Sequence, residues 1–110
     1  MIKIPMSVAA AGLLRTILAR VSINRDRILL TEFQSVDWQS LTFVGERHQV
    51  QFRILGPNSD ELVEALIDGL ADAEFSIPGH IVADIALSGD LERNTDGSMT
   101  VNLEALTVAE

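Results

Sequence analysis

The segment MSVAAAGLLRTILARV, residues 6–21, constrains the fold most, because it is almost wholly apolar and follows a helical period. Its apolar residues recur at the spacing that places side chains on one helix face: Ala10, Leu13, Leu14, Ile17, Leu18 and Val21. With Ser7 as a suitable N-cap, this pattern predicts a helix over residues 7–21. The small residues Ala9 and Gly12 fall outside the stripe and allow close approach, so we expect the helix to be buried on more than one side.

A targeting peptide and a membrane anchor are two other interpretations of this segment. A transmembrane helix needs about 20 consecutive apolar residues, and Arg15 and Arg20 interrupt the run, which excludes a membrane span. A secretory signal needs an apolar run of roughly 7–15 residues before a small-residue cleavage site. Residues 6–14 are long enough for that, but the helical pattern continues past Arg15 to Val21. We therefore expect a helix of the mature fold, with a cleaved leader as the alternative.

Length and composition indicate one globular domain, residues 1–110. Apolar residues make up 47% of the chain and charged residues 22%, which excludes intrinsic disorder. The chain has no cysteine, which excludes disulfides and thiolate metal sites and fits a cytoplasmic location. Its formal net charge of −8 argues against a nucleic-acid partner, because binding phosphates requires clustered cations.

Residues 28–55 read as a β-hairpin. We predict extended runs over residues 28–33 and 36–44 with a bend at Gln34–Ser35, a turn at Gly45–Arg47, and a returning strand over residues 48–55. In the returning strand, Val50, Phe52 and Ile54 alternate with Gln49, Gln51 and Arg53. Such alternation is typical of an antiparallel strand with one buried and one wet face.

A second helix is expected over residues 59–73, with Asn58 and Glu61 at the spacing of a capping box. Its expected buried stripe is Leu62, Val63, Leu66, Ile67 and Leu70, and its expected solvated face is Asp60, Glu61, Glu64, Asp68 and Asp72. The sequence Ile77–Pro78–Gly79–His80 then fits a type II turn, because proline suits the second position and glycine the third.

The last hairpin can be placed in register from its hydrophobic pattern. A two-residue Asp96–Gly97 loop would set the apolar face of one strand against the polar face of the other. A three-residue loop, Thr95–Asp96–Gly97 with Gly97 left-handed, instead pairs Leu91 with Val101 and Leu87 with Ala105. We therefore predict a type I turn with a G1 bulge.

These elements predict an α+β fold, a two-layer sandwich with the order αββαββ. Both helices would lie on one face of a four-stranded antiparallel sheet. The alternative is a ferredoxin-like fold, in which residues 1–6 add a short strand.

The motifs of catalytic and cofactor sites are missing. The sequence has no G-x-S-x-G, P-loop or dinucleotide fingerprint. Serine–histidine dyads are expected only by accident; the serines considered are Ser22, Ser35, Ser40 and Ser88. His48 with Glu46, or His80 with Asp84, falls short of the three protein ligands that even an open zinc site needs. We expect both histidines to be solvated at turns or strand edges, and predict no enzyme, no cofactor and no metal.

Large apolar residues fall on both faces of the first hairpin. Trp38 and Val36 are expected on the sheet face away from the helices, whereas Leu41, Phe43 and Leu55 fall on the opposite alternation unless a bulge resets it. A two-layer monomer cannot bury both sets. Either a bulge restores a single apolar face, or one set forms a partner surface.

The function predicted from the sequence is a non-enzymatic domain that self-associates as a homodimer or docks on a partner protein. The expected interface is either the open sheet face, with Trp38, Phe43 and Leu55, or the small-residue side of the first helix, with Ala9 and Gly12. The alternative is a small-molecule-binding or regulatory domain, with an apolar pocket between sheet and helices and His48 or Arg53 at its mouth.

Overall fold

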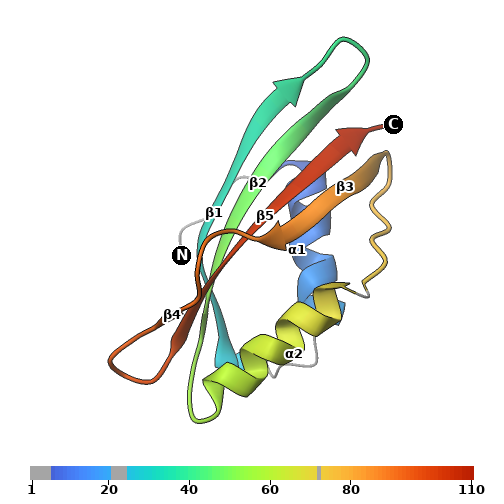
Figure 1. The fold of residues 1–110 in the computed structure, drawn as a ribbon. Coiled ribbons are helices and arrows are strands. Elements are labelled where there is room, and N and C mark those ends of the chain that lie inside the picture. Colours follow the sequence, from blue (N-terminus) through green and yellow to red (C-terminus); the bar gives the residue numbers. More distant parts are fainter. Residues whose placement is uncertain (1–5, 21–24, 72) are drawn as a thin grey trace.

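The computed structural model of the chain describes residues 6–20, 25–71 and 73–110. The fold is α+β, with two α-helices and a mostly antiparallel sheet (Figure 1). Its elements in chain order are α1 (Val8–Arg20), a 3₁₀ turn (Arg25–Arg27), β1 (Ile28–Gln39), β2 (Val44–Ile54), α2 (Ser59–Ala71), β3 (His80–Leu87), β4 (Glu92–Arg93) and β5 (Met99–Ala109). The ferredoxin-like alternative depends largely on residues 1–5, which lie outside the described residues, as do Val21, Ser22 and Asp72.

Among the described residues the sheet has five strands, with β1, β2, β5 and β3 side by side and β4 also paired with β5. The prediction of four strands in the order αββαββ is therefore wrong in one respect. The expected third strand does not continue through Leu91 but is divided into β3 and β4. Gly89 lies between them with φ +75°, a left-handed conformation that favours glycine and interrupts an extended strand.

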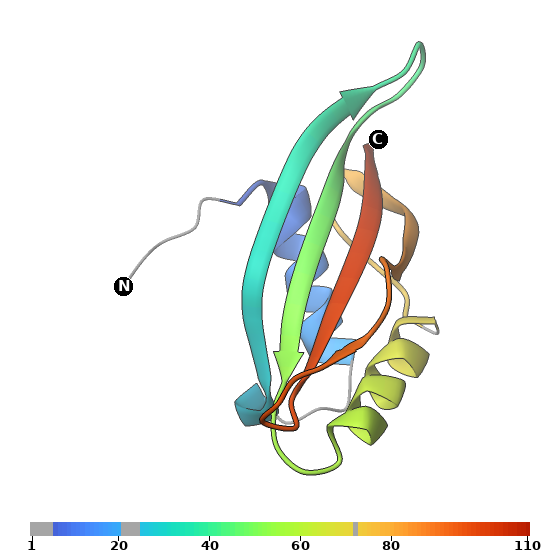
Figure 2. The ribbon, with the colours of Figure 1, turned by 60° about the vertical axis from the view of Figure 1, so that its left-hand side comes forward.

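Both helices pack on one face of the sheet, where α1 lies behind the strands in the view of Figure 2. Leu13 and Ile17 of α1 join Val63, Leu66 and Leu70 of α2 in a single buried cluster. The sheet supplies Val50, Phe52, Ile54, Val101, Leu103 and Ala105 to the same cluster. The predicted helix stripes and the alternation of β2 are thus confirmed for the described residues.

Ser7 is the N-cap of α1, as predicted from the sequence. The Ser7 hydroxyl accepts a hydrogen bond from the backbone N–H of Ala10 at 3.1 Å, and the Ser7 carbonyl accepts one from Ala11 at 2.9 Å. The same hydroxyl donates to Glu46 Oε1 at 2.7 Å. Ser7 therefore both begins the helix and ties its N-terminus to β2.

The first hairpin turns at a different place from the one predicted. Strand β1 continues to Gln39, and the turn is made by residues 40–43, where the Ser40 N–H donates to the Phe43 carbonyl at 2.8 Å and the Ser40 hydroxyl accepts from the Phe43 N–H at 3.1 Å. Gly45 lies within β2. The irregularity in β1 falls between Leu30 and Glu32, not at Gln34–Ser35.

The last hairpin has the predicted loop. Asn94 N–H donates to the Ser98 carbonyl at 2.8 Å, Gly97 N–H donates to the Asn94 carbonyl at 3.0 Å, and Gly97 has φ +86°. Glu92 pairs with Thr100, which is the register expected for this part of the hairpin. Beyond the interruption the register differs, because Leu87 pairs with Leu103 and not with Ala105. The predicted turn at residues 77–80 is present, with φ +77° at Gly79 and a 3.0 Å bond from His80 N–H to the Ile77 carbonyl.

Candidate functional site: the open face of the sheet

The register of the strands arranges the helix-free face of the sheet into rows that run across it. One row is wholly apolar and crosses four strands: Trp38, Gly45, Val108 and Ile81. We call these residues the apolar row. The next row consists of Val36, Arg47, Leu106 and Asp84. Because side chains alternate between faces, both rows point away from the helices.

Trp38 lies on Gly45, its direct partner in the β1–β2 ladder. A Cβ atom at position 45 would come within 2.8 Å of Trp38 Nε1 and would collide with the backbone carbonyl oxygen of Thr107. Because Gly45 has no side chain, the Trp38 indole can pack directly against the backbone of the sheet at this position. Trp38 Nε1 is buried in this position and has no hydrogen-bond partner among the described residues. An unpaired buried N–H costs roughly 1–3 kcal/mol, so the indole N–H destabilises the monomer as it stands.

The apolar row belongs to a larger exposed apolar end of the molecule. Val36 and Ile81 are 63% and 52% exposed, whereas Trp38 and Val108 are half-buried. The tip of the β1–β2 hairpin, which projects past the end of β5 in Figure 1, adds the exposed residues Leu41, Phe43 and Val44. The apolar row, Val36 and this tip form a surface that a soluble monomer seldom leaves uncovered.

The five residues predicted to form an interface do not come together. Trp38 lies on the open face as expected, and Phe43 lies near it at the hairpin tip. Leu55 follows the end of β2, about 30 Å along the strand from Trp38. Ala9 and Gly12 are buried inside the chain, where a Cβ at position 12 would meet Ile77 Cγ2 at 2.8 Å. The small-residue side of α1 thus packs internally, and only Trp38 and Phe43 belong to the apolar end.

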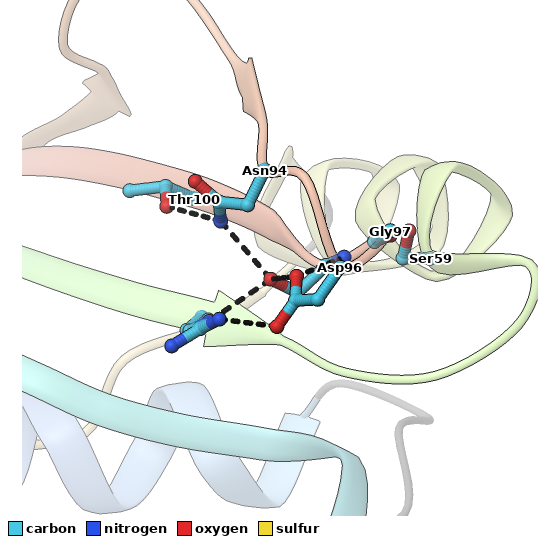
Figure 3. A network of polar contacts seen from close by, with 7 residues as sticks. Ser59, Asn94, Asp96, Gly97 and Thr100 are labelled. Carbon is cyan, nitrogen blue, oxygen red and sulfur yellow. Dashed lines mark hydrogen bonds and ion pairs between the residues drawn. The ribbon is translucent and has the colours of Figure 1, made fainter.

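At the other end of the open face, polar side chains form hydrogen bonds and an ion pair with one another. Arg53 Nε donates to Ser98 Oγ at 2.9 Å, and the Arg53 guanidinium forms an ion pair with Asp96. Asn94 Nδ2 donates to Ser98 Oγ and to Thr100 Oγ1, both at 3.0 Å. Figure 3 shows how these contacts join β2 to the last hairpin. Since Arg53 and Asn94 are engaged within the chain, this end offers less unpaired surface than the apolar end.

His48 is not a solvated turn residue, and the prediction that it is exposed is wrong. It is fully buried on the helix face of β2, because the true turn lies five residues earlier than Gly45 and leaves His48 inside the strand. Its Nδ1 atom lies 2.7 Å from Ser35 Oγ, and its Nε2 atom lies 2.9 Å from Thr107 Oγ1. Burial lowers the pKa of His48 below its ordinary value, partly opposed by the nearby negative charge of Glu46, and His80 adds a smaller lowering.

A small apolar cleft of about 130 Å³ lies between α2 and β3. Its lining includes Ile67, Leu70, Ile85, Leu87 and Leu103. Neither His48 nor Arg53 lines this cleft, so the predicted polar mouth is not at this place. Within the described part of the chain, no three histidine or acidic side chains gather where they could hold a metal ion. Neither described helix has both the length and the apolarity needed to cross a membrane.

No model of a known protein family matches the chain, and a search of curated proteins finds no match. The site itself is therefore the basis for a function: an apolar end on the open face of the sheet.

Proposed function

We propose that this chain is a non-enzymatic interaction domain that forms a homodimer through its apolar end. The observation that carries the proposal is the apolar row, which crosses four strands on a face that no described helix covers. Large aromatic residues dominate the energies of protein interfaces, and Trp38 lies at one end of this row. Removing this surface from water supplies the driving force for association.

The apolar row is a place where two copies of this acidic chain can meet, because the row itself carries no charge. The chain carries a net charge of −8, so two copies repel one another over most of their surface. The apolar row carries no charge, and in the neighbouring row Arg47, 3.5 Å from Glu104, partly offsets the negative charges of Glu104 and Asp84. Two copies related by a two-fold axis can therefore approach apolar row to apolar row. Such a symmetric contact is the commonest form of soluble oligomer.

The proposal is tested by light scattering on the purified chain at about 10 μM. A specific dimer, which buries roughly 1,200–2,000 Å², has twice the 12.0 kDa mass of one chain. A 12 kDa species at this concentration would contradict the homodimer.

A matched pair of charge substitutions locates the interface. Val36→Asp and Leu29→Asp each add one acid to β1, on the same open face, at positions that are 63% and 45% exposed. Val36→Asp should give a monomer with an unchanged melting curve, whereas Leu29→Asp, near the polar end, should leave the dimer intact. Trp38→Ala should also weaken the dimer. If both Asp variants behave alike, the interface lies elsewhere.

The cleft between α2 and β3 favours a second candidate, the binding of a small apolar group. An apolar cavity of roughly 150 Å³ holds benzene, and this cleft has about 130 Å³. Binding would raise the melting temperature in the presence of benzene, and Leu87→Asp, at the cleft wall, should abolish that rise.

A further inference from the structure

A second feature, on the helix face of the sheet, lies outside the proposed interface. Ser35 of β1 and His48 of β2 are direct partners in the β-ladder, so their side chains project from the same face. The resulting contact between Ser35 Oγ and His48 Nδ1 is 2.7 Å long. His48 is completely buried, whereas Ser35 is exposed. A buried imidazole thus touches the hydroxyl of an exposed residue on the edge strand.

The hydrogen bonds around His48 favour one direction for this contact. Thr107 Oγ1 lies 3.4 Å from the Glu46 carbonyl, to which it can donate weakly, and 2.9 Å from His48 Nε2, from which it can then accept. With its hydrogen on Nε2, the imidazole has a free lone pair on Nδ1 and accepts from the Ser35 hydroxyl. This tautomer is assigned from the hydrogen-bond network. A nucleophile, a base and a group that orients the base are the arrangement that activates serines in acyl transfer.

The surroundings keep His48 suited to accepting a proton. Burial lowers its pKa, which leaves the imidazole neutral at neutral pH with a lone pair free to accept a proton, while the Glu46 carboxylate favours the imidazolium that forms when the proton arrives. A positive charge on His80 would oppose the protonation of His48. The ring centroids of Phe33 and His48 are 6.1 Å apart, and the two rings pack in a T-shaped arrangement. This contact helps to orient the imidazole ring. Access comes from the side of β1, which forms one edge of the sheet.

We propose that Ser35 is an activated acyl acceptor, a site of covalent modification by esters and thioesters with good leaving groups. Ser35 Oγ attacks the acyl carbon and forms a new C–O bond, while its proton passes to His48 Nδ1. The bond from the acyl carbon to the leaving oxygen or sulfur then breaks, and that atom takes the proton from His48. The product is an O-acyl serine and a free alcohol, phenol or thiol. The acyl group stays on the protein, and no turnover is required.

The test uses p-nitrophenyl acetate on the full chain, with peptide mapping by mass spectrometry. Trypsin releases residues 28–47 as one peptide that contains both Ser35 and Ser40. Ser40 is an internal control, because it is exposed in the hairpin turn and its hydroxyl contacts the Phe43 N–H instead of a base. General-base assistance contributes about 10²–10⁴-fold, so Ser35 should be acetylated at least about 100-fold faster than Ser40. Equal rates at the two serines would overturn the proposal.

The pH profile of the unmodified sequence separates base assistance from simple exposure. With His48 as the base, acetylation of Ser35 should reach a plateau above the pKa of His48 and fall tenfold for each pH unit below it. A serine that reacts through its own alkoxide gains tenfold per unit across the whole range, as Ser40 should. A Ser35 rate that follows the Ser40 profile contradicts the role of His48. His48→Gln should remove the preference for Ser35 where circular dichroism shows that it folds, and the pH profile decides the matter where it does not.

Discussion

Trp38 of β1 and Gly45 of β2 face one another directly across the ladder, and the indole occupies space that any side chain at position 45 would fill. Glycine weakens the interior of a strand, and an aromatic residue across the ladder compensates by covering it. The pair therefore explains two facts together: a glycine is tolerated inside an 11-residue strand, and a tryptophan lies on the solvent side of the sheet.

Gly45→Ala should destabilise the fold. The new Cβ would collide with the Thr107 carbonyl, which belongs to the backbone of the adjacent strand and cannot rotate away, and would displace the Trp38 indole. Overpacking of this kind costs about 1–3 kcal/mol, measured as a loss in the free energy of unfolding in urea. Gln49→Ala, on the same face of β2, should change it by less than about 0.5 kcal/mol. Equal effects of the two substitutions would show that Gly45 has no special packing role.

The same glycine explains why the first turn is predicted from the sequence at the wrong place. Gly45–Glu46–Arg47 has turn-like composition, whereas the true turn, Ser40–Leu41–Thr42–Phe43, contains neither glycine nor proline. The true turn is closed by the side chain of Ser40, a weaker local signal than a glycine. The need for glycine at position 45 comes from the Thr107 backbone on β5 and from Trp38 on β1, and contacts across strands leave no local pattern. A turn predicted at Gly45–Arg47 puts His48 at a strand edge, so the sequence does not predict its burial.

His48 should make stability depend on pH. Its pKa in the folded chain lies below the value of about 6.5 of an unfolded histidine, because burial disfavours the charged form. The unfolded chain therefore binds a proton first as the pH falls. The contribution of neutral His48 is complete above about pH 6.5 and is lost progressively below it, until the pKa in the folded state is reached. Urea denaturation at pH 8 and at pH 5.5 measures this loss.

Substitution of the two histidines separates a buried role from an exposed one. His48→Ala should cost at least about 2 kcal/mol, since it empties a buried site and removes the hydrogen bond between His48 Nε2 and Thr107 Oγ1. His80→Ala should stay within about 0.5 kcal/mol, because the turn bond of His80 uses its backbone N–H. A stability profile that is as steep below pH 6.5 in His48→Ala as in the unmodified chain would assign the pH dependence to other groups.

Ser98 is the centre of the polar contacts at the far end of the sheet. It is buried, accepts from Arg53 Nε and Asn94 Nδ2, and donates to Asp96 Oδ1 at 2.6 Å. Ser98→Ala would leave those two donors without this acceptor and should lower the free energy of unfolding by about 1–3 kcal/mol. Thr95→Ala, an exposed position of the same loop, is the matched control and should change it by less than about 0.5 kcal/mol. A Ser98→Ala variant as stable as the control would mean that water replaces the hydroxyl.

The candidate site was only partly predictable for a reason of geometry. The alternation of β1 predicts Trp38 and Val36 on the open face. The hydrophobic pattern of the last hairpin predicts the loop Thr95–Asp96–Gly97, because a two-residue loop would set an apolar face against a polar one. The apolar row, however, joins residues from four strands that lie up to 70 positions apart in sequence. Its existence depends on the order β1, β2, β5 and β3 and on two register shifts. Neither is encoded locally, so the sequence indicated single apolar residues but not their assembly into one surface.

Helix α1 lies within the segment whose sequence fits either a core helix or a targeting peptide. Its residues Leu13 and Ile17 are completely buried in the same cluster as Phe52 and Val101 of the sheet. Burying each such side chain contributes roughly 1.5–3 kcal/mol, against a total stability of about 5–15 kcal/mol for a domain of ordinary size. Deleting residues 1–21 should therefore leave a chain that aggregates or fails to melt cooperatively, as followed by circular dichroism and light scattering. Leu13→Ala tests the same role more gently, with an expected loss of about 2–5 kcal/mol in the free energy of unfolding, whereas Val8→Ala, at an exposed position of the same helix, should be nearly neutral. A shortened chain that stays soluble and melts as the full chain does would show that α1 is dispensable to the fold, as a cleaved leader would be.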